Sequence, residues 1–296
     1  MPALPLVRDA AGSATGHRSL RAAAWRRFRR NHLALGGATA VAVLVIAAAC
    51  APYLAPFDPA HQALAEKLSG PGARHWLGTD EFGRDVLSRL IYGSRVELIV
   101  GFAAVLMGLT LGVVLGTASA YWGGVMDEIT MRVLDVLLAF PYLLLAILAV
   151  SVLGANLRST ILAVGLWATP GFARVIRGLV LRTIVQEYVE ASRAIGARTI
   201  RIIFRHILPN CISVMVVYSA LYMASAILLE AGLSFLGLGV QPPTPSWGIM
   251  VSTGRTYLLE APHIATFAGL AIAVTVLGFN LVADGLRDIW DTKLTL

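Results

Sequence analysis

Long apolar stretches separated by short polar segments dominate the chain. An α-helix needs about 20 mostly apolar residues to cross a bilayer. Six stretches approach or exceed that length: Leu33–Leu54, Leu98–Tyr121, Val136–Leu153, Thr160–Val175, Ile212–Val240 and Ile264–Val282. We expect Pro141 to kink the third stretch and Pro170 to interrupt the fourth, which neighbouring helices can tolerate. The pattern predicts an all-α integral membrane protein with six transmembrane helices.

The composition agrees with a membrane protein. Hydrophobic residues make up 57% of the 296 and charged residues only 14%, against about 25% charged in soluble domains. Cys50 and Cys211 lie in or beside apolar stretches, so we expect two separate thiols and no disulfide. The net charge of +7 comes from arginines beside the spans, which indicates membrane lipids and no nucleic acid as partners.

The distribution of basic residues predicts the orientation. If the N-terminus is inside, the cytoplasmic segments hold 17 of the 24 Lys and Arg residues and the external segments hold seven. Cytoplasmic loops carry the excess of positive charge, so both termini are predicted to be cytoplasmic. Residues 1–32 form a basic cytoplasmic segment, and 33–54 is too long for a signal-peptide core and serves as an uncleaved first span.

The first external loop, residues 55–95, contains a helical pattern near its end. In Asp85–Tyr92, the apolar residues Val86, Leu87, Leu90 and Ile91 fall on one helical face. We expect a short helix lying on the outer surface. It either meets a solute-delivery protein or packs over the bundle.

The cytoplasmic loop at about 183–209 predicts a helix–turn–helix. Residues 182–195 are mostly good helix formers and Gly196 is the natural break. A second helical turn begins at Thr199 and is expected to stop at Pro209. Val189, Ala194 and Ile195 could enter a groove of a partner; alternatively, this is a basic interfacial helix with no partner.

The same loop resembles a family motif. Glu190-Ala191, Gly196 six residues after the glutamate and Ile207-Leu208-Pro209 match the EAA loop of binding-protein-dependent ABC import permeases. Ser192 replaces the second alanine of that motif, a small-for-small change. The resemblance implies that this loop carries the coupling helix that docks into an ATPase subunit.

Three further segments, residues 75–89, 233–248 and 280–288, resemble the C-type permease of dipeptide, oligopeptide and nickel importers. The likeness covers about residues 25–291 and departs from the usual Asp-Pro at Asp291-Thr292. It implies a type I ABC importer permease fold with a five-helix core within 96–296, in the bacterial inner membrane. The implied partners are a homologous second permease, two ATPase domains and an extracytoplasmic solute-binding protein. The implied cargo is a dipeptide or oligopeptide, or else nickel or another small solute.

Polar and small residues within the spans are the candidates for transport. Ser219, Tyr222, Ser225 and Glu230 are candidate pathway residues, and Glu230 could instead be a structural acid. Gly108, Gly112 and Gly116 form a stripe of small residues for close helix packing, either within this chain or against the second permease.

The sequence shows no motif for nucleotide binding, catalysis or metal binding. It has no phosphate-binding loop, because both lysines, Lys67 and Lys293, are followed by leucine. No catalytic constellation or metal-ligand pattern is visible, so we expect a transporter subunit without cofactors, with ATP and Mg²⁺ bound by partner ATPases. The rival interpretations are a secondary transporter, which generally needs charged or broken-helix sites at the midplane, and a membrane-embedded enzyme.

Overall fold

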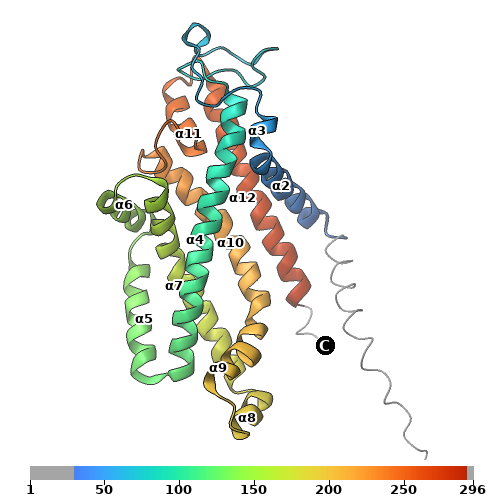
Figure 1. The fold of residues 1–296 in the computed structure, drawn as a ribbon, viewed down its shortest axis with the longest axis vertical. Helices are drawn as coiled ribbons and strands as arrows, with labels where there is room; N and C mark the ends of the chain where they lie inside the picture. The colour runs from blue at the N-terminus through green and yellow to red at the C-terminus, as the bar shows by residue number, and fades with distance from the viewer. Residues whose placement is uncertain (1–29, 292–296) are drawn as a thin grey trace, which may run out of the picture.

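The computed structural model describes residues 30–291, with side chains up to Ile289. Across these residues the regular structure is helical, apart from an isolated bridge between Thr79 and Asp85. The helices form an elongated bundle with an irregular cap at one end and the short helices α8 and α9 at the other (Figure 1). The all-α prediction is therefore confirmed. Of the basic segment 1–32, residues 1–29 lie outside the described range.

The helices follow one another with short connections between most of them. They are α2 (His32–Ala49), α3 (Ala51–Leu54), α4 (Val86–Trp122), α5 (Gly124–Ala139), α6 (Tyr142–Leu153), α7 (Leu157–Ile184), α8 (Glu187–Ala194), α9 (Thr199–Ile202), α10 (Leu208–Phe235), α11 (Trp247–Thr256) and α12 (Pro262–Asp291). A 3₁₀ turn, Leu64–Glu66, lies in the cap, and a π-helical turn, Ile203–Ile207, joins α9 to α10.

Five of these helical segments are long and apolar enough to cross a membrane, and the bent pair α5 and α6 makes a sixth. The number of spans therefore agrees with the sequence prediction when the pair counts as one. The bend predicted at Pro141 is confirmed, and it is a full break at which the chain turns by 93°. Proline lacks an N–H and disfavours helix in the residue before it, and α6 points away from α5 (Figure 1). Pro170, by contrast, lies inside a continuous α7.

The separate surface helix predicted at Asp85–Tyr92 is wrong. This segment is the outer end of the 37-residue helix α4. Asp85 caps the helix by accepting a 2.7 Å hydrogen bond from the N–H of Ser88. Ser88 and Arg89 are buried beneath the cap, where Arg89 donates to the carbonyl of Pro59 at 3.2 Å. The polar face is thus the inner one, because the cap supplies its partners.

The cytoplasmic loop differs from its prediction at two places. The predicted helix 182–195 is interrupted at 185–186, between the end of α7 and the start of α8. Pro209 does not stop the second helix, because the helical path continues from α9 through the π turn into α10. Pro209 lies at the start of α10, directly after the π-helical turn.

The glycine stripe of α4 packs within this chain. A Cβ on Gly108 would lie 2.8 Å from the Cβ of Ala168, and one on Gly116 would run into the carbonyl of Ala173. Small residues let two helices approach closely, and here the backbones of α4 and α7 come into close contact. Of the two uses left open by the sequence, packing inside the subunit is the one observed. Cys50 and Cys211 are both free thiols, as predicted.

Candidate functional site

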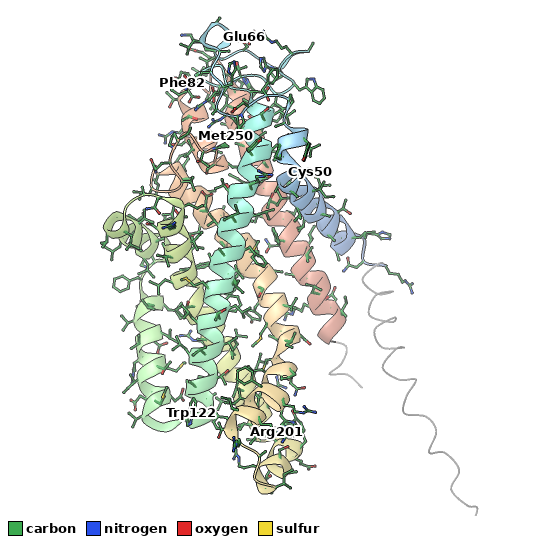
Figure 2. All side chains as sticks on the ribbon, in the orientation of Figure 1. Cys50, Glu66, Phe82, Trp122, Arg201 and Met250 are labelled. Carbon is green, nitrogen blue, oxygen red and sulfur yellow. The ribbon has the colours of Figure 1, made fainter. Side chains whose placement is uncertain are left out.

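The loop at about 183–209, which we call the coupling loop after the motif that it resembles, protrudes at the end of the molecule opposite the cap (Figure 1). Figure 2 places Arg201 and Trp122 at this end, and Glu66 and Phe82 at the other. Gly196 follows α8 with a φ of +80°, a left-handed conformation that favours glycine. The N–H of Ala197 donates to Ser192 O at 3.1 Å and that of Gly196 to Arg193 O at 3.0 Å. This is the Schellman end of a helix, as the prediction of a glycine break requires.

Helix α8 is held against α10 by one apolar and several polar contacts. Val189 is fully buried, so its predicted place in a partner's groove is wrong; it anchors α8 from within. The hydroxyl of Tyr188 accepts a 3.1 Å hydrogen bond from Asn210, and the Ser192 hydroxyl lies 3.4 Å from His206 Nε2. These contacts tie α8 to the π turn and to the first residues of α10.

The loop carries exposed apolar side chains among its charged ones. Ile195 is 86% exposed, and Ile200 and Phe204 are about two-thirds exposed. The sequence prediction included Ile195 and missed the other two, which lie beyond Gly196 on α9 and the π turn. Glu190, Ala191 and Ala194 are also exposed, and Ile207 is buried beneath them. Leu208 is half-buried and Pro209 exposed at the start of α10.

The four candidate pathway residues on α10 do not share one environment. Ser219 and Tyr222 are half-buried, Ser225 is exposed and Glu230 is fully buried. The hydroxyls of Ser219 and Ser225 donate to carbonyls of the preceding turn, at 2.8 and 3.3 Å. The ring of Tyr222 packs against Phe172 and Trp167 of α7, with centroids 4.5 and 5.4 Å away. The structure thus separates Glu230 from the other three.

Glu230 belongs to a buried polar cluster near the cap. Its Oε1 accepts hydrogen bonds from the hydroxyls of Ser234 at 2.6 Å and Ser246 at 3.2 Å. The carboxyl group of Glu97 lies within hydrogen-bonding reach of the Glu230 carboxyl group. Oε2 of each glutamate is buried without an N–H or O–H donor. This placement supports the structural one of the two roles that the sequence left open.

The same cluster fixes the position of α11. The N–H of Trp247 donates to Glu97 Oε1 at 3.3 Å, and its indole N–H donates to Leu90 O at 3.0 Å. The indole packs so closely on Gly93 that a Cβ there would lie 2.7 Å from the ring. Sequence reasoning missed Glu97, because it lies one residue outside the apolar stretch 98–121. The sequence feature that could have indicated Glu97 is an acidic residue directly before a predicted span.

A network of charged side chains builds the cap. Arg84 Nε donates to Asp80 Oδ2 at 2.6 Å, and His75 Nδ1 lies 2.8 Å from Asp85 Oδ1. Burial, with the charge of Asp80 beside it, raises the pKa of the Glu81 carboxyl group. His263 Nε2 lies 3.1 Å from Thr79 O and ties the cap to α12. Within residues 30–291, three potential metal ligands of the His, Cys, Asp or Glu kind nowhere gather in one place.

The described residues thus form a bundle of membrane-length helices, capped at one end and carrying a protruding helical loop at the other. Two family profiles match the chain. One is described as the binding-protein-dependent transport system inner membrane component and covers residues 108–296, more than half of the chain. The other is the N-terminal TM domain of oligopeptide transport permease C and covers residues 19–71. The chain belongs to the family of binding-protein-dependent inner-membrane transport permeases.

Curated relatives and solved structures agree with this assignment. The chain is 44% identical over 271 residues to the glutathione transport system permease proteins GsiD of Pectobacterium atrosepticum and Escherichia coli O1:K1. The alignments cover 91% of this chain and 90% and 89% of those proteins. Among solved structures, an inward-facing methionine ABC transporter, MetNI, superposes with a TM-score of 0.56 at 17% identity, covering 69% of this chain and 97% of that one. An amino acid ABC transporter reaches 0.52 at 15% identity, covering 71% and 95%. The type I importer permease fold predicted from the sequence is confirmed.

Proposed function

We propose that this chain pairs with a second, homologous permease to form the translocation pathway of an ATP-driven importer of short peptides. The observation that carries the proposal is the coupling loop, whose exposed apolar face around Ile195, Ile200 and Phe204 has no partner in this chain. One of two ATPase domains covers that face, and an extracytoplasmic binding protein delivers the solute at the cap. The relatives named for glutathione, a tripeptide, favour short peptides as the cargo.

The coupling loop and the cap communicate along α10. Docking of an ATPase domain moves α8, and α8 is fastened to the beginning of α10 through Tyr188 and Asn210. The other end of α10 carries Glu230, which holds α11 beneath the cap. Because a helix transmits displacement along its axis, the closure of the ATPases on ATP can shift the cap end of the pathway. ATP and Mg²⁺ are bound by those partner domains.

The orientation follows from the coupling loop and the basic residues together. The loop must face the cytoplasm, where ATP is available, so both termini are cytoplasmic and the cap is external. Arg174, Arg177 and Arg182 lie within α7 and not in the cytoplasmic loop to which the sequence count assigned them. Without these three, 14 of the original 17 basic residues remain on the cytoplasmic side, against seven outside. The excess still favours this orientation.

The test is a site-directed cross-link. In a background with Cys50→Ala and Cys211→Ala, Ile195→Cys is exposed to a short bismaleimide in inside-out vesicles that contain the whole complex. We expect a covalent product with an ATPase subunit, and none from the matched external variant Ser69→Cys. A cross-link from Ile195→Cys to the binding protein, or labelling of Ile195→Cys by an impermeant reagent from outside, would refute the proposal.

A further inference from the structure

An exposed ion pair bridges the two helices α5 and α7. Arg174 Nη2 lies 2.6 Å from Asp135 Oδ1, and the two side chains are 57% and 55% exposed. A single hydrogen bond joins them, so the second carboxylate oxygen and most guanidinium N–H groups face outward. Charged residues on spanning helices are rare and expensive, and they normally face a partner or a water-filled cavity.

The pair lies at the depth of the apolar part of the bundle. On α4, Gly112 and Gly116 pack against the backbone of residues 172–177 of α7. Arg174 is therefore level with the inner half of the apolar stretch 98–121. Asp135 is flanked on α5 by Val133 and Val136, both more than half exposed. Lipid tails cannot solvate these two charges, so a pair on this surface needs water or a polar partner beside it.

A second ion pair between the same helices shows what a purely structural bridge looks like here. Arg177 donates from Nε and Nη2 to both carboxylate oxygens of Asp127, each at 2.6 Å. The side chains of Arg177 and Asp127 are only 32% and 22% exposed, and the Ser119 hydroxyl also donates to Asp127. Both carboxylate oxygens of Asp127 thus accept hydrogen bonds from within this chain. In the other pair, only one oxygen of Asp135 accepts a hydrogen bond from Arg174.

Aromatic and hydroxyl groups lie along the face of α7 that carries Arg174. A Cβ on Gly171, one turn before Arg174, would run into the hydroxyl of Tyr222 of α10. Tyr222 stacks on Trp167, and Trp167 on Tyr142 at the start of α6, with centroids 5.4 and 5.8 Å apart. Trp167 and Tyr222 are half-buried and Tyr142 is half-exposed. One surface thus offers a cation, an anion, a phenol and aromatic faces.

From this surface we infer a transient solute site in the translocation pathway, built for zwitterionic peptides: Arg174 receives the α-carboxylate, Asp135 the α-ammonium group, and Tyr222 and Trp167 the peptide body. The inference rests on the proposed function and names the chemistry its cargo must present. The two protein charges neutralise each other before the solute arrives and are each matched by the solute afterwards. The exchange of partners leaves no charge unpaired at any stage, which keeps the desolvation cost low. Bidentate recognition of a carboxylate is what a guanidinium does best.

The test measures binding in the absence of the selective binding protein. The complete permease–ATPase complex is placed in nanodiscs, and equilibrium dialysis gives its affinity for radiolabelled trialanine, trialanine amide and N-acetyl-trialanine. In the wild type we expect the two blocked peptides to bind about 10–100-fold more weakly, the effect of losing one charge-assisted hydrogen-bonded contact. Arg174→Ala should abolish the preference against the amide and keep that against the acetylated peptide. Asp135→Ala should do the reverse, and Arg174→Lys should show an intermediate preference.

The matched control is Arg177→Ala, which removes the ion pair with Asp127 between the same two helices and should leave both preferences intact. Equal binding of the three peptides by the wild type, or an unchanged amide preference in Arg174→Ala, overturns the inference. Loss of the second permease from purified Arg174→Lys would assign the pair to subunit contact and also overturn it. The proposed function is judged separately, by ATP-driven uptake of trialanine into wild-type proteoliposomes. Normal uptake with unaltered selectivity in the variants would sink only the solute site.

Discussion

The backbone N–H of Trp247 donates to the carboxyl group of Glu97 over 3.3 Å, which fastens the first residue of α11 to α4. A carboxylate at a helix N-terminus is also favoured by the helix dipole. Glu230 joins the same cluster from α10 and accepts from Ser246, the residue before α11. Three helices therefore meet on two acids that lie far apart in the sequence.

Removal of one acid should loosen this junction. Glu230→Ala leaves the hydroxyls of Ser234 and Ser246 and the Glu97 carboxyl group without their partner, at a cost of roughly 1–3 kcal/mol for each group left unsatisfied. Glu230→Gln should be milder, since an amide can both accept and donate. Thermal unfolding in detergent, followed by the reactivity of the buried Cys211 thiol, measures the effect. The control is Glu128→Gln, at an exposed position on α5. A wild-type melting curve for Glu230→Ala would show that the cluster does not stabilise the fold.

Filling the α4–α7 contact should be more damaging. A Cβ on Gly112 would collide with Phe172 of α7, so Gly112→Val forces two backbones apart and costs roughly 3 kcal/mol or more. We expect little folded protein in size-exclusion chromatography. Gly269→Val, on α12 with open space around it, is the control and should yield normal amounts. Equal yields of the two variants would contradict the packing described here.

How far the sequence predicts this structure depends on the kind of signal. Apolar stretches revealed the spans, because bilayer thickness sets their length. The same signal could not show that α4 extends outward to Val86 or that the chain breaks at Pro141. Those outcomes depend on the cap that covers Ser88 and Arg89, and on packing between distant segments. The count of charges assigned Arg174 to the cytoplasmic loop although the predicted span 160–175 includes it, and α7 in fact continues to Ile184.

Gly196 is predicted to be sensitive for conformational reasons alone. Its φ is +80°, and no atom lies within 4 Å of the position that a Cβ would take. Gly196→Ala should therefore cost about 1–2 kcal/mol in the local turn, and Gly196→Asn less, because asparagine tolerates this conformation. Proteolysis of the coupling loop in nanodiscs should rise in the order Gly, Asn, Ala. An alanine variant as resistant as the wild type would mean that the turn does not need glycine.

The cap should become more stable on mild acidification through Glu81. Burial and Asp80 raise the pKa of Glu81 in the folded protein above the value of 4.5 that applies when unfolded. The folded state then binds more protons in that range, so this contribution is fully present below pH 4.5 and is lost as pH rises through the folded pKa. Glu81→Gln should flatten the pH dependence of hydrogen exchange in the cap, relative to the wild type. An identical pH profile for both proteins would rule out this role for Glu81.

The most direct test of the central claim is uptake by the reconstituted complex. Proteoliposomes contain the two permeases and the ATPases, with the binding protein and radiolabelled trialanine outside and ATP inside. The account predicts accumulation that requires both ATP and the binding protein, and that Gly196→Asp abolishes while the subunits remain assembled. Accumulation driven by an ion gradient without ATP, or full uptake by Gly196→Asp, would contradict it.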